Sequence, residues 1–264
     1  MKRRDLSFLR GAALQEHQLK AEQITYPPLD VPKPVTASVW IVDSGPTKAM
    51  GVIPLPIRMT IIRLQDGSLM LHSPSRYDST LRRSLEEFGA INHIIAPNSA
   101  HWMFVKQWQE HCPSVETWGA PGLSKRWPVK RAGVRLDHEL TPDVRTPWSD
   151  EISHIIVKGI GFAEVALMHE RSRSLVLADL VQNLEADKLP PVLRPAARLA
   201  GVVAPHGRAT VYLRAIVKMK RNEAAAAARR LVNLKPRFVI FSHGQWYAED
   251  ATVRLASALD WLLE

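Results

Sequence analysis

After residue 35, the chain contains short runs rich in apolar and β-branched residues, a pattern typical of β-strands. This pattern predicts strands over Ser38–Val42, Met59–Leu64 and Ser68–His72. The last two flank Asp66-Gly67, a dipeptide that favours a tight hairpin turn. We therefore expect these two strands to pair in antiparallel fashion.

Helical patterns separate the next strands. Ser79 stands where it can cap a helix that Gly89 ends, and a second helix is predicted over His101–His111. The short apolar strands Ile91–Ala96 and Val115–Trp118 alternate with these helices. The order strand–helix–strand–helix–strand indicates a sheet with helices packed on it.

The second half of the chain repeats this order of strands followed by helices. The predicted strands are Ile152–Val157, Ala163–Met168, Ser174–Ala178 and Arg237–Ser242, and the predicted helices are Leu189–Leu199, Ala209–Met219, Glu223–Leu234 and Ala251–Leu263. Two similar halves predict an α/β domain of two stacked sheets with helices outside, over residues 36–264. Residues 1–35, which end in prolines, are expected to form an N-terminal arm with a short helix around Ala12–Gln23.

The composition is that of a globular protein. The chain has 264 residues, of which 46% are hydrophobic and 23% charged, and its single cysteine, Cys112, cannot form an internal disulfide. The net charge is +9 at pH 7, but the basic residues are dispersed, which favours a solvated surface over a nucleic-acid or lipid patch. No stretch approaches the roughly 20 apolar residues that span a bilayer, and the N-terminus does not resemble a signal peptide. We therefore expect a cytoplasmic protein.

The polar residues that could carry chemistry share one property, which is that they stand where predicted strands end. They are His72, Asn98, His101, His169, Asp179 and His243. Histidine and aspartate are ligands that zinc and similar metals accept, and loops beyond strand ends often carry function. Each residue taken alone also fits an ordinary turn or cap. Together they predict one site, provided that the strand ends lie on one edge of the sheets.

Several well-known catalytic motifs are absent from the sequence. There is no Walker loop, no G-x-G-x-x-G, no H-E-x-x-H and no G-x-S-x-G nucleophile elbow. These absences argue against a P-loop nucleotidase, a dinucleotide-dependent enzyme, a zincin protease and an α/β-hydrolase.

A set of ordered motifs resembles those of a metallo-β-lactamase-like domain. The motifs are Thr60–Gly67, Leu71–Pro74, Ile95–Asn98 with His101, Phe162–Val165, His169–Ser174, Leu177–Asn183 and Phe241–Gly244. More narrowly, the chain is similar to a family of unknown function within that superfamily, over roughly residues 36–264. The resemblance implies a four-layer αββα sandwich with its site along one edge, where loops from both halves meet.

The resemblance also implies which residues could bind metal. Asp179 matches the bridging aspartate of the superfamily, and His243 matches its C-terminal histidine ligand. The usual histidine-rich turn is replaced by Ala96–Trp102, in which His101 remains and Trp102 stands where the narrower family has a second histidine. The later histidine position is also lost, so that Glu164 could substitute for it. His169 lies five residues beyond Glu164 and can reach the site only from the turn after the strand.

Two functions from different classes follow from this reduced motif. The first is a metal-dependent hydrolase with at most one ion, zinc or iron, held by some of His101, Glu164, His169, Asp179 and His243, and acting on a small-molecule substrate. The second is a binding or regulatory domain that keeps the fold and uses no metal. Nucleic-acid processing is a third and less favoured reading, based on the positive charge. The substrate and the oligomeric state follow from none of these patterns.

Overall fold

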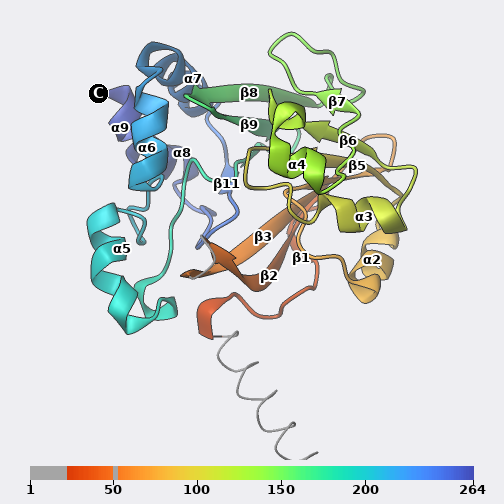
Figure 1. The fold of residues 1–264 in the computed structure, drawn as a ribbon, viewed down its shortest axis with the longest axis horizontal. Helices are drawn as coiled ribbons and strands as arrows, with labels where there is room; N and C mark the ends of the chain where they lie inside the picture. Colours follow the sequence, from red (N-terminus) through yellow and green to blue (C-terminus); the bar gives the residue numbers. More distant parts are fainter. Residues whose placement is uncertain (1–22, 50–52) are drawn as a thin grey trace, which may run out of the picture.

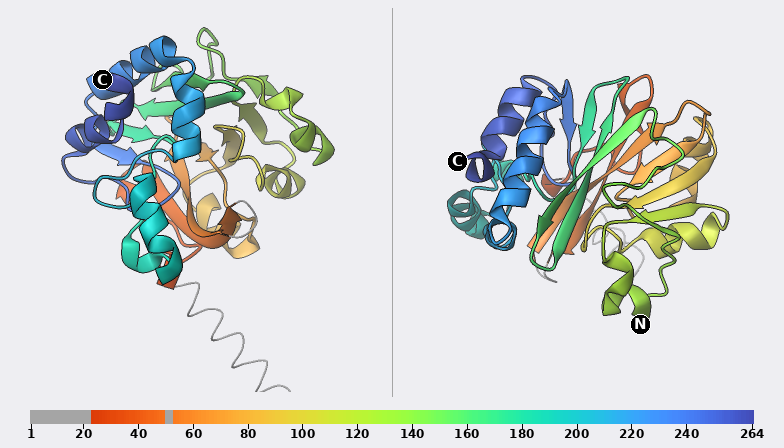
Figure 2. Two further views of the ribbon diagram at one scale, coloured as in Figure 1. Left: turned by 60° about the vertical axis from the view of Figure 1, so that its left-hand side comes forward. Right: turned by 90° about the horizontal axis from the view of Figure 1, so that it is seen from above.

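The strands of the two halves form two sheets packed face to face (Figure 1). The structure, a computed structural model, describes residues 23–49 and 53–264. It confirms the expected four-layer αββα sandwich, because helices cover the outer face of each sheet (Figure 2).

The first sheet contains seven strands among the described residues, in the same order along the sheet as in the chain. They are β1 (Lys33–Thr36), β2 (Val39–Ala49), β3 (Ile53–Arg63), β4 (Leu69–His72), β5 (Ile91–Ala96), β6 (Glu116–Gly119) and β7 (His138–Glu139). Strands β1 to β4 pair antiparallel, whereas β4 to β7 pair parallel through helical crossovers. Parallel pairing brings the carboxyl ends of β4 and β5 to the same edge of the sheet.

The second sheet has the order β11-β10-β9-β8. Its strands are β8 (Ile152–Gly159), β9 (Phe162–His169), β10 (Ser174–Val176) and β11 (Phe238–Ile240). Strand β9 is antiparallel to β10, and β10 is parallel to β11. The start of β9 therefore lies at the same edge as the ends of β10 and β11.

Helices from each half pack on the nearer sheet. They are α2 (Ser79–Glu86), α3 (Val105–His111) and α4 (Trp127–Arg131) on the first sheet, and α6 (Val211–Lys218), α7 (Arg221–Asn233), α8 (Ala251–Ala258) and α9 (Asp260–Leu263) on the second. Helix α5 (Arg194–Ala200) packs elsewhere, against Leu55 of β3. Seen from above in Figure 2, the blue C-terminal helices, the two sheets and the yellow-green helices follow one another as layers.

Three apolar clusters hold these layers together. Ile41 and Ile95 of the first sheet meet Leu167 and Ile240 of the second in the cluster between the sheets. The other two clusters lie between each sheet and its helices. Burial of these apolar side chains, at about 25 cal/mol per Å² removed from water, is the main force that stabilises the stacking.

The structure confirms the predicted hairpin and changes several boundaries. Strands β3 and β4 pair antiparallel around the Asp66-Gly67 turn. The cap of α2 is Asp78 rather than Ser79, since the Asp78 carboxylate accepts hydrogen bonds from the next turn. The helix expected to begin at His101 begins at Val105, because a turn precedes it. Local hydrogen bonds set both of these helix boundaries, and apolar periodicity does not reveal such bonds.

The N-terminal part differs from the expectation where it is described. Strand β1 already begins at Lys33, inside the expected arm of residues 1–35, and pairs with β2. The helix expected around Ala12–Gln23 lies, except for Gln23, outside the described residues. Among the described helices, none is long and apolar enough to cross a membrane.

Candidate metal centre

Three of the predicted ligands meet at the edge where strands β5, β10 and β11 end. His101, Asp179 and His243 each offer one ligand atom, and these atoms all lie within 4.8 Å of one another. Nε2 of His101 lies 3.2 Å from Oδ2 of Asp179, and Nε2 of His243 lies 3.4 Å from Oδ1 of the same carboxylate. Over residues 23–49 and 53–264, no other group of His, Cys, Asp and Glu meets the same test. We call these three residues the His-Asp-His cluster.

The loop after β5 positions His101. The Asn98 side-chain oxygen accepts hydrogen bonds from the backbone N–H groups of Ala100 and His101, which closes a turn directly after Pro97. This is the usual way in which asparagine stabilises a turn. Nδ1 of His101 lies 2.6 Å from Oγ of Ser73, which follows β4. Nε2 of His101 therefore faces Asp179.

His243 is held in the matching orientation. Its Nδ1 lies 2.8 Å from the carbonyl oxygen of Pro56, and because a carbonyl only accepts, Nδ1 donates. A neutral imidazole then carries its lone pair on Nε2, the atom that faces Asp179. The next residue, Gly244, has φ +93°, and a Cβ there would lie 2.2 Å from the carbonyl oxygen of Asn183. Only glycine allows this close approach, which brings the loop of His243 beside the loop of Asp179.

Asp179 is almost enclosed by polar partners. Burial alone would raise the pKa of its carboxyl, but His101 and His243 outweigh this effect and hold the pKa well below its ordinary value. The pKa of His101 is shifted in the opposite direction. Burial lowers it, but the charge and hydrogen bond of Asp179 outweigh burial and raise the pKa above its ordinary value. The side chain of Gln182 donates a further hydrogen bond to Asp179 at 3.3 Å. The carboxylate is thus ionised at neutral pH and available as a ligand.

Glu164 lies behind Asp179 and is fully buried. Its carboxylate accepts backbone hydrogen bonds from Ala178, Asp179 and Leu180, and one from the amide of Asn98. Burial, followed by the charge of Asp179, raises the pKa of Glu164, while these donors oppose the rise. Because both oxygens are occupied by donors, Glu164 fixes the Asp179 loop and is not placed as a metal ligand.

His72 and Trp102 lie next to the cluster and do not join it. His72, at the end of β4, is buried with its Nε2 unpartnered, and burial with the nearby His101 lowers its pKa from 6.5 to about 3. It is therefore a neutral imidazole at physiological pH. Trp102 donates from Nε1 to the carbonyl of Ser99 and packs on the core between the first sheet and its helices.

The structure does not bring His169 to this site, contrary to the expectation. His169 ends β9, opposite Ile152, whereas Glu164 lies near the start of the same strand at the site edge. A strand rises about 3.3 Å per residue, so the two lie at opposite ends of β9. Nδ1 of His169 lies instead 2.6 Å from Oγ of Ser172 in the following turn. Burial, followed by the charge of Arg171, lowers its pKa.

Sequence reasoning missed the residues that orient the ligands. Ser73 and Pro56 touch the histidines, and Gln182 touches Asp179. Ser73 carried one usable signal, because it directly follows the His72 strand end in a Ser-Pro turn. Pro56 contributes only its backbone carbonyl, which has no sequence signal.

The donor set fits a single divalent ion. Bonds of about 2.0–2.2 Å to a tetrahedral zinc ion place neighbouring ligand atoms about 3.3–3.6 Å apart. Nε2 of His101 lies 3.2 Å from Oδ2 of Asp179 and Nε2 of His243 lies 3.4 Å from Oδ1, so each histidine is near this spacing from one of the two carboxylate oxygens. The partly buried carboxylate of Asp179 and the fully buried one of Glu164 also favour positive charge nearby, which the histidines and a bound ion would together supply.

The layered architecture and the edge site define a protein of the metallo-β-lactamase fold, and solved structures of that fold are similar to this one. A metallo-β-lactamase from Pontibacter korlensis matches with TM-score 0.58 and 13% identity, over 88% of this chain and 97% of that chain. FIM-1 from Pseudomonas aeruginosa, in its mono-zinc form, matches with TM-score 0.55 and 14% identity over 87% and 94%. A metallo-β-lactamase from Hirschia baltica matches with TM-score 0.56 and 13% identity over 85% and 95%.

The family is narrower than the fold. The family described as "Domain of unknown function (DUF4336)" matches residues 37–227, and the chain belongs to it. The match includes His101 and Asp179 and ends before His243, which the structure nevertheless brings to the same cluster. No curated protein matches the chain.

Proposed function

We propose that this protein is a metal-dependent hydrolase with one divalent ion, zinc or iron, held by His101, Asp179 and His243. The observation that carries the proposal is the convergence of these three ligand atoms within 4.8 Å, with the far nitrogen of each histidine fixed by a partner. Fixed imidazoles of this kind are typical of metal sites, because they set which nitrogen carries the lone pair.

Three protein ligands match the number found in catalytic zinc sites, which leave a fourth position for water or substrate. Zinc in such a site supplies Lewis acidity, which polarises a carbonyl or phosphoryl oxygen and assists attack by water at neutral pH. The chain's own residues hold the ligands in place. Asn98 and Glu164 fix the loop that carries Asp179, and Ser73 and Pro56 orient the two histidines.

One surface hollow away from the cluster is not part of this proposal. It measures about 820 Å³ and is lined by Glu116, Asp137, His138 and neighbouring residues. Glu116 begins β6 and His138 begins β7, whereas the cluster lies at the carboxyl edge of the sheet. We therefore assign the proposed hydrolysis to the His-Asp-His cluster at that edge and not to this hollow.

The experiment is metal analysis of the purified protein and three variants, after loading with zinc or iron and removal of unbound ion. We expect about one ion per chain in the wild type and a loss of more than tenfold in affinity in His243→Ala and Asp179→Ala. His169→Ala is the matched control and should keep its ion, because His169 lies at the other end of β9. Loaded protein is then assayed against chromogenic esters, thioesters and phosphodiesters.

Trace metal alone in the reconstituted wild type would contradict the proposal. Such a result would favour the second function, a metal-free binding domain. That reading is supported by the contact of His101 with Asp179, since Nε2 of His101 can donate a hydrogen bond to the carboxylate at 3.2 Å without an ion.

A further inference from the structure

Another surface hollow, of about 280 Å³, is lined in part by the chain segments that lead to the candidate metal centre. Two of its lining residues neighbour the site along the chain, since Ser99 follows Asn98 and Ala163 precedes Glu164. The hollow lies between the turn after β6, which contains Gly122, and the β8–β9 hairpin around Gly161. A substrate bound here would therefore lie beside the His-Asp-His cluster.

All the ionisable side chains that line this hollow are cationic. They are Arg126, Lys158 and Lys220, and no carboxylate lines it. Arg126 donates to the carbonyl of Gly161 at 2.9 Å, and Lys220 pairs with Glu223 only at 3.7 Å. Lys158 is half-buried in β8 and makes no hydrogen bond or ion pair with any residue in the described part of the chain. An ammonium group without a hydrogen-bond or ion-pair partner in the described part of the chain can bind an anion, together with the neighbouring Arg126.

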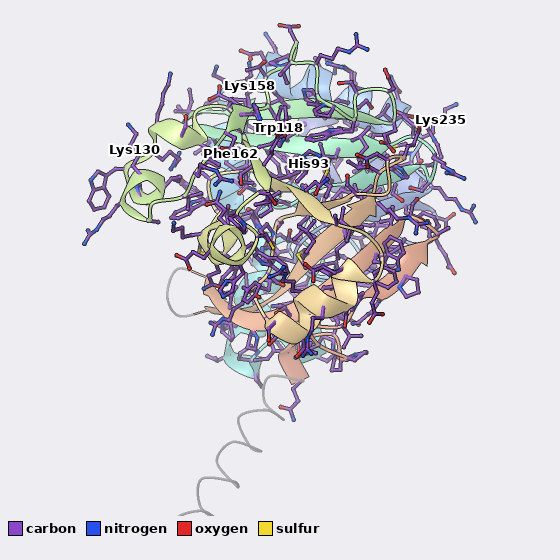
Figure 3. The ribbon with its side chains drawn as sticks, turned by 90° about the vertical axis from the view of Figure 1, so that its right-hand side faces the viewer. His93, Trp118, Lys130, Lys158, Phe162 and Lys235 are labelled. Carbon is purple, nitrogen blue, oxygen red and sulfur yellow. The ribbon has the colours of Figure 1, made fainter. Side chains whose placement is uncertain are left out.

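The rest of the lining is apolar. Phe162 is half-buried opposite Gly159 in the β8–β9 hairpin, and Leu123 and Ala120 are buried on the other wall. Figure 3 shows Lys158 and Phe162 close together on one side of the molecule, near α4 with its exposed Lys130. A pocket with an apolar wall and a few convergent polar groups is the usual form of a small-molecule site.

We propose that this hollow is the subsite that selects the substrate, and that it takes an oxyanion carried on a compact apolar body. In this inference Lys158 and Arg126 bind the anionic group, Phe162 packs against the apolar part, and the scissile bond extends toward His101 and Asp179. As a substrate subsite the inference rests on the proposed function, whereas binding of the anion itself does not require a metal.

The experiment measures binding of phenylphosphonate, which joins a benzene ring to a dianion, to chelator-treated, metal-free protein by calorimetry or NMR. Lys158→Met keeps the apolar stem and removes the charge, and it should weaken binding by about five- to tenfold. Lys158→Arg should restore most of the affinity. Lys130→Met removes an equal charge from α4, outside the hollow, and should leave affinity unchanged.

Two comparison ligands test the two parts of the recognition. Benzyl alcohol lacks the charge and inorganic phosphate lacks the ring, so each should bind more weakly than phenylphosphonate. Added salt should weaken phenylphosphonate binding in the wild type more than in Lys158→Met. Equal affinity in Lys158→Met and Lys130→Met would overturn the subsite, whether or not the protein binds metal. Binding that depends on Lys158 in a protein that never takes up metal would keep the subsite and refute the hydrolase.

Discussion

Asn98 and Glu164 are joined by a buried hydrogen bond of 2.9 Å from Nδ2 to Oε2, although 66 residues separate them in the chain. The same nitrogen donates its second hydrogen to Oδ2 of Asp179, also at 2.9 Å. One amide thus bridges the buried carboxylate of Glu164 and the partly buried one of Asp179, which would otherwise repel each other. The bridge links the loop after β5 in the first sheet to the loop after β10 in the second.

Replacing Asn98 tests this bridge. Asn98→Asp places a third carboxylate against two others and removes both donors, so we expect a loss of about 2–4 kcal/mol in the free energy of unfolding at pH 8. The loss of stability should be smaller at pH 5.5, because protonation of one of the three neighbouring carboxylates relieves the repulsion. Asn98→Ala, which only removes the hydrogen bonds, should lose about 1–3 kcal/mol with little dependence on pH. Urea unfolding of metal-free protein at the two pH values measures both. An Asn98→Asp penalty that is the same at both pH values would contradict the repulsion.

The strands and helices that sequence predicted best are those with a continuous apolar pattern. The core strands Ile91–Ala96 and Ile152–Gly159 and the alanine-rich helix α7 fall close to their predicted positions. Strand β7 has two exposed residues and therefore no apolar pattern to detect. The outer halves of β2 and β3 contain Gly45, Pro46 and Pro54, which interrupt any strand pattern although the backbone continues to pair.

The candidate site was predicted only in part, because the direction in which each strand runs within its sheet was not known from the sequence. His101, Asp179 and His243 were first selected because each follows a predicted strand, and the resemblance then matched them to metal ligands. His169 was grouped with them because it also ends a strand, but β9 runs antiparallel to β10, so its end lies at the other edge. A sequence shows where a strand ends, but not in which direction the strand runs within its sheet.

The buried His72 makes the protein sensitive to acid. Its pKa is lowered from 6.5 to about 3 by burial and by His101, so the folded state resists protonation. As the pH falls from 6.5 toward 3, the unfolded chain takes up a proton that the folded state does not, and stability is lost. The linkage slope for one such group is about 1.4 kcal/mol per pH unit.

His72→Leu removes this proton uptake. Between pH 6 and pH 4.5, the free energy of unfolding of the metal-free variant should therefore fall less steeply than that of the wild type. We expect the two slopes to differ by up to about 1.4 kcal/mol per pH unit. His206→Leu is the control, since it removes an exposed imidazole elsewhere. Denaturant unfolding at four or five pH values gives the slopes. If the slopes of the wild type and His72→Leu coincide, His72 is not the group responsible.

Arg58 connects the first sheet to the loop that carries His243. Its guanidinium pairs with Asp43 at 2.6 Å, and both side chains are 3% exposed. Nη1 of Arg58 donates to the carbonyl oxygens of Phe241 and Gly244, at 3.1 and 2.7 Å, on either side of His243. Asp43 also pairs with Lys33 at 2.7 Å. Removing Arg58 therefore leaves Asp43 with Lys33 as its one remaining charged partner among the described residues, and leaves two carbonyl oxygens short of a donor.

We expect Arg58→Met to lower the free energy of unfolding by about 2–4 kcal/mol, because two carbonyl oxygens lose their donor and the buried Asp43 keeps only Lys33 as a charged partner. Arg63→Met is the matched control on the same strand. Arg63 is exposed and makes one hydrogen bond of 3.5 Å to Ala37, so its loss should be below about 1 kcal/mol. The double variant Arg58→Met/Asp43→Leu should regain part of the stability, because it also removes the buried carboxylate that Lys33 alone would otherwise balance.

The double variant Arg58→Met/Asp43→Leu also separates the effect of Arg58 on stability from its effect on the position of His243. If Arg58 holds the backbone on both sides of His243, the double variant should recover stability yet still bind zinc more weakly than the wild type. Metal titration under conditions where both proteins are folded measures this difference. Full recovery of zinc affinity together with stability would show that the β11 loop keeps His243 in place without Arg58.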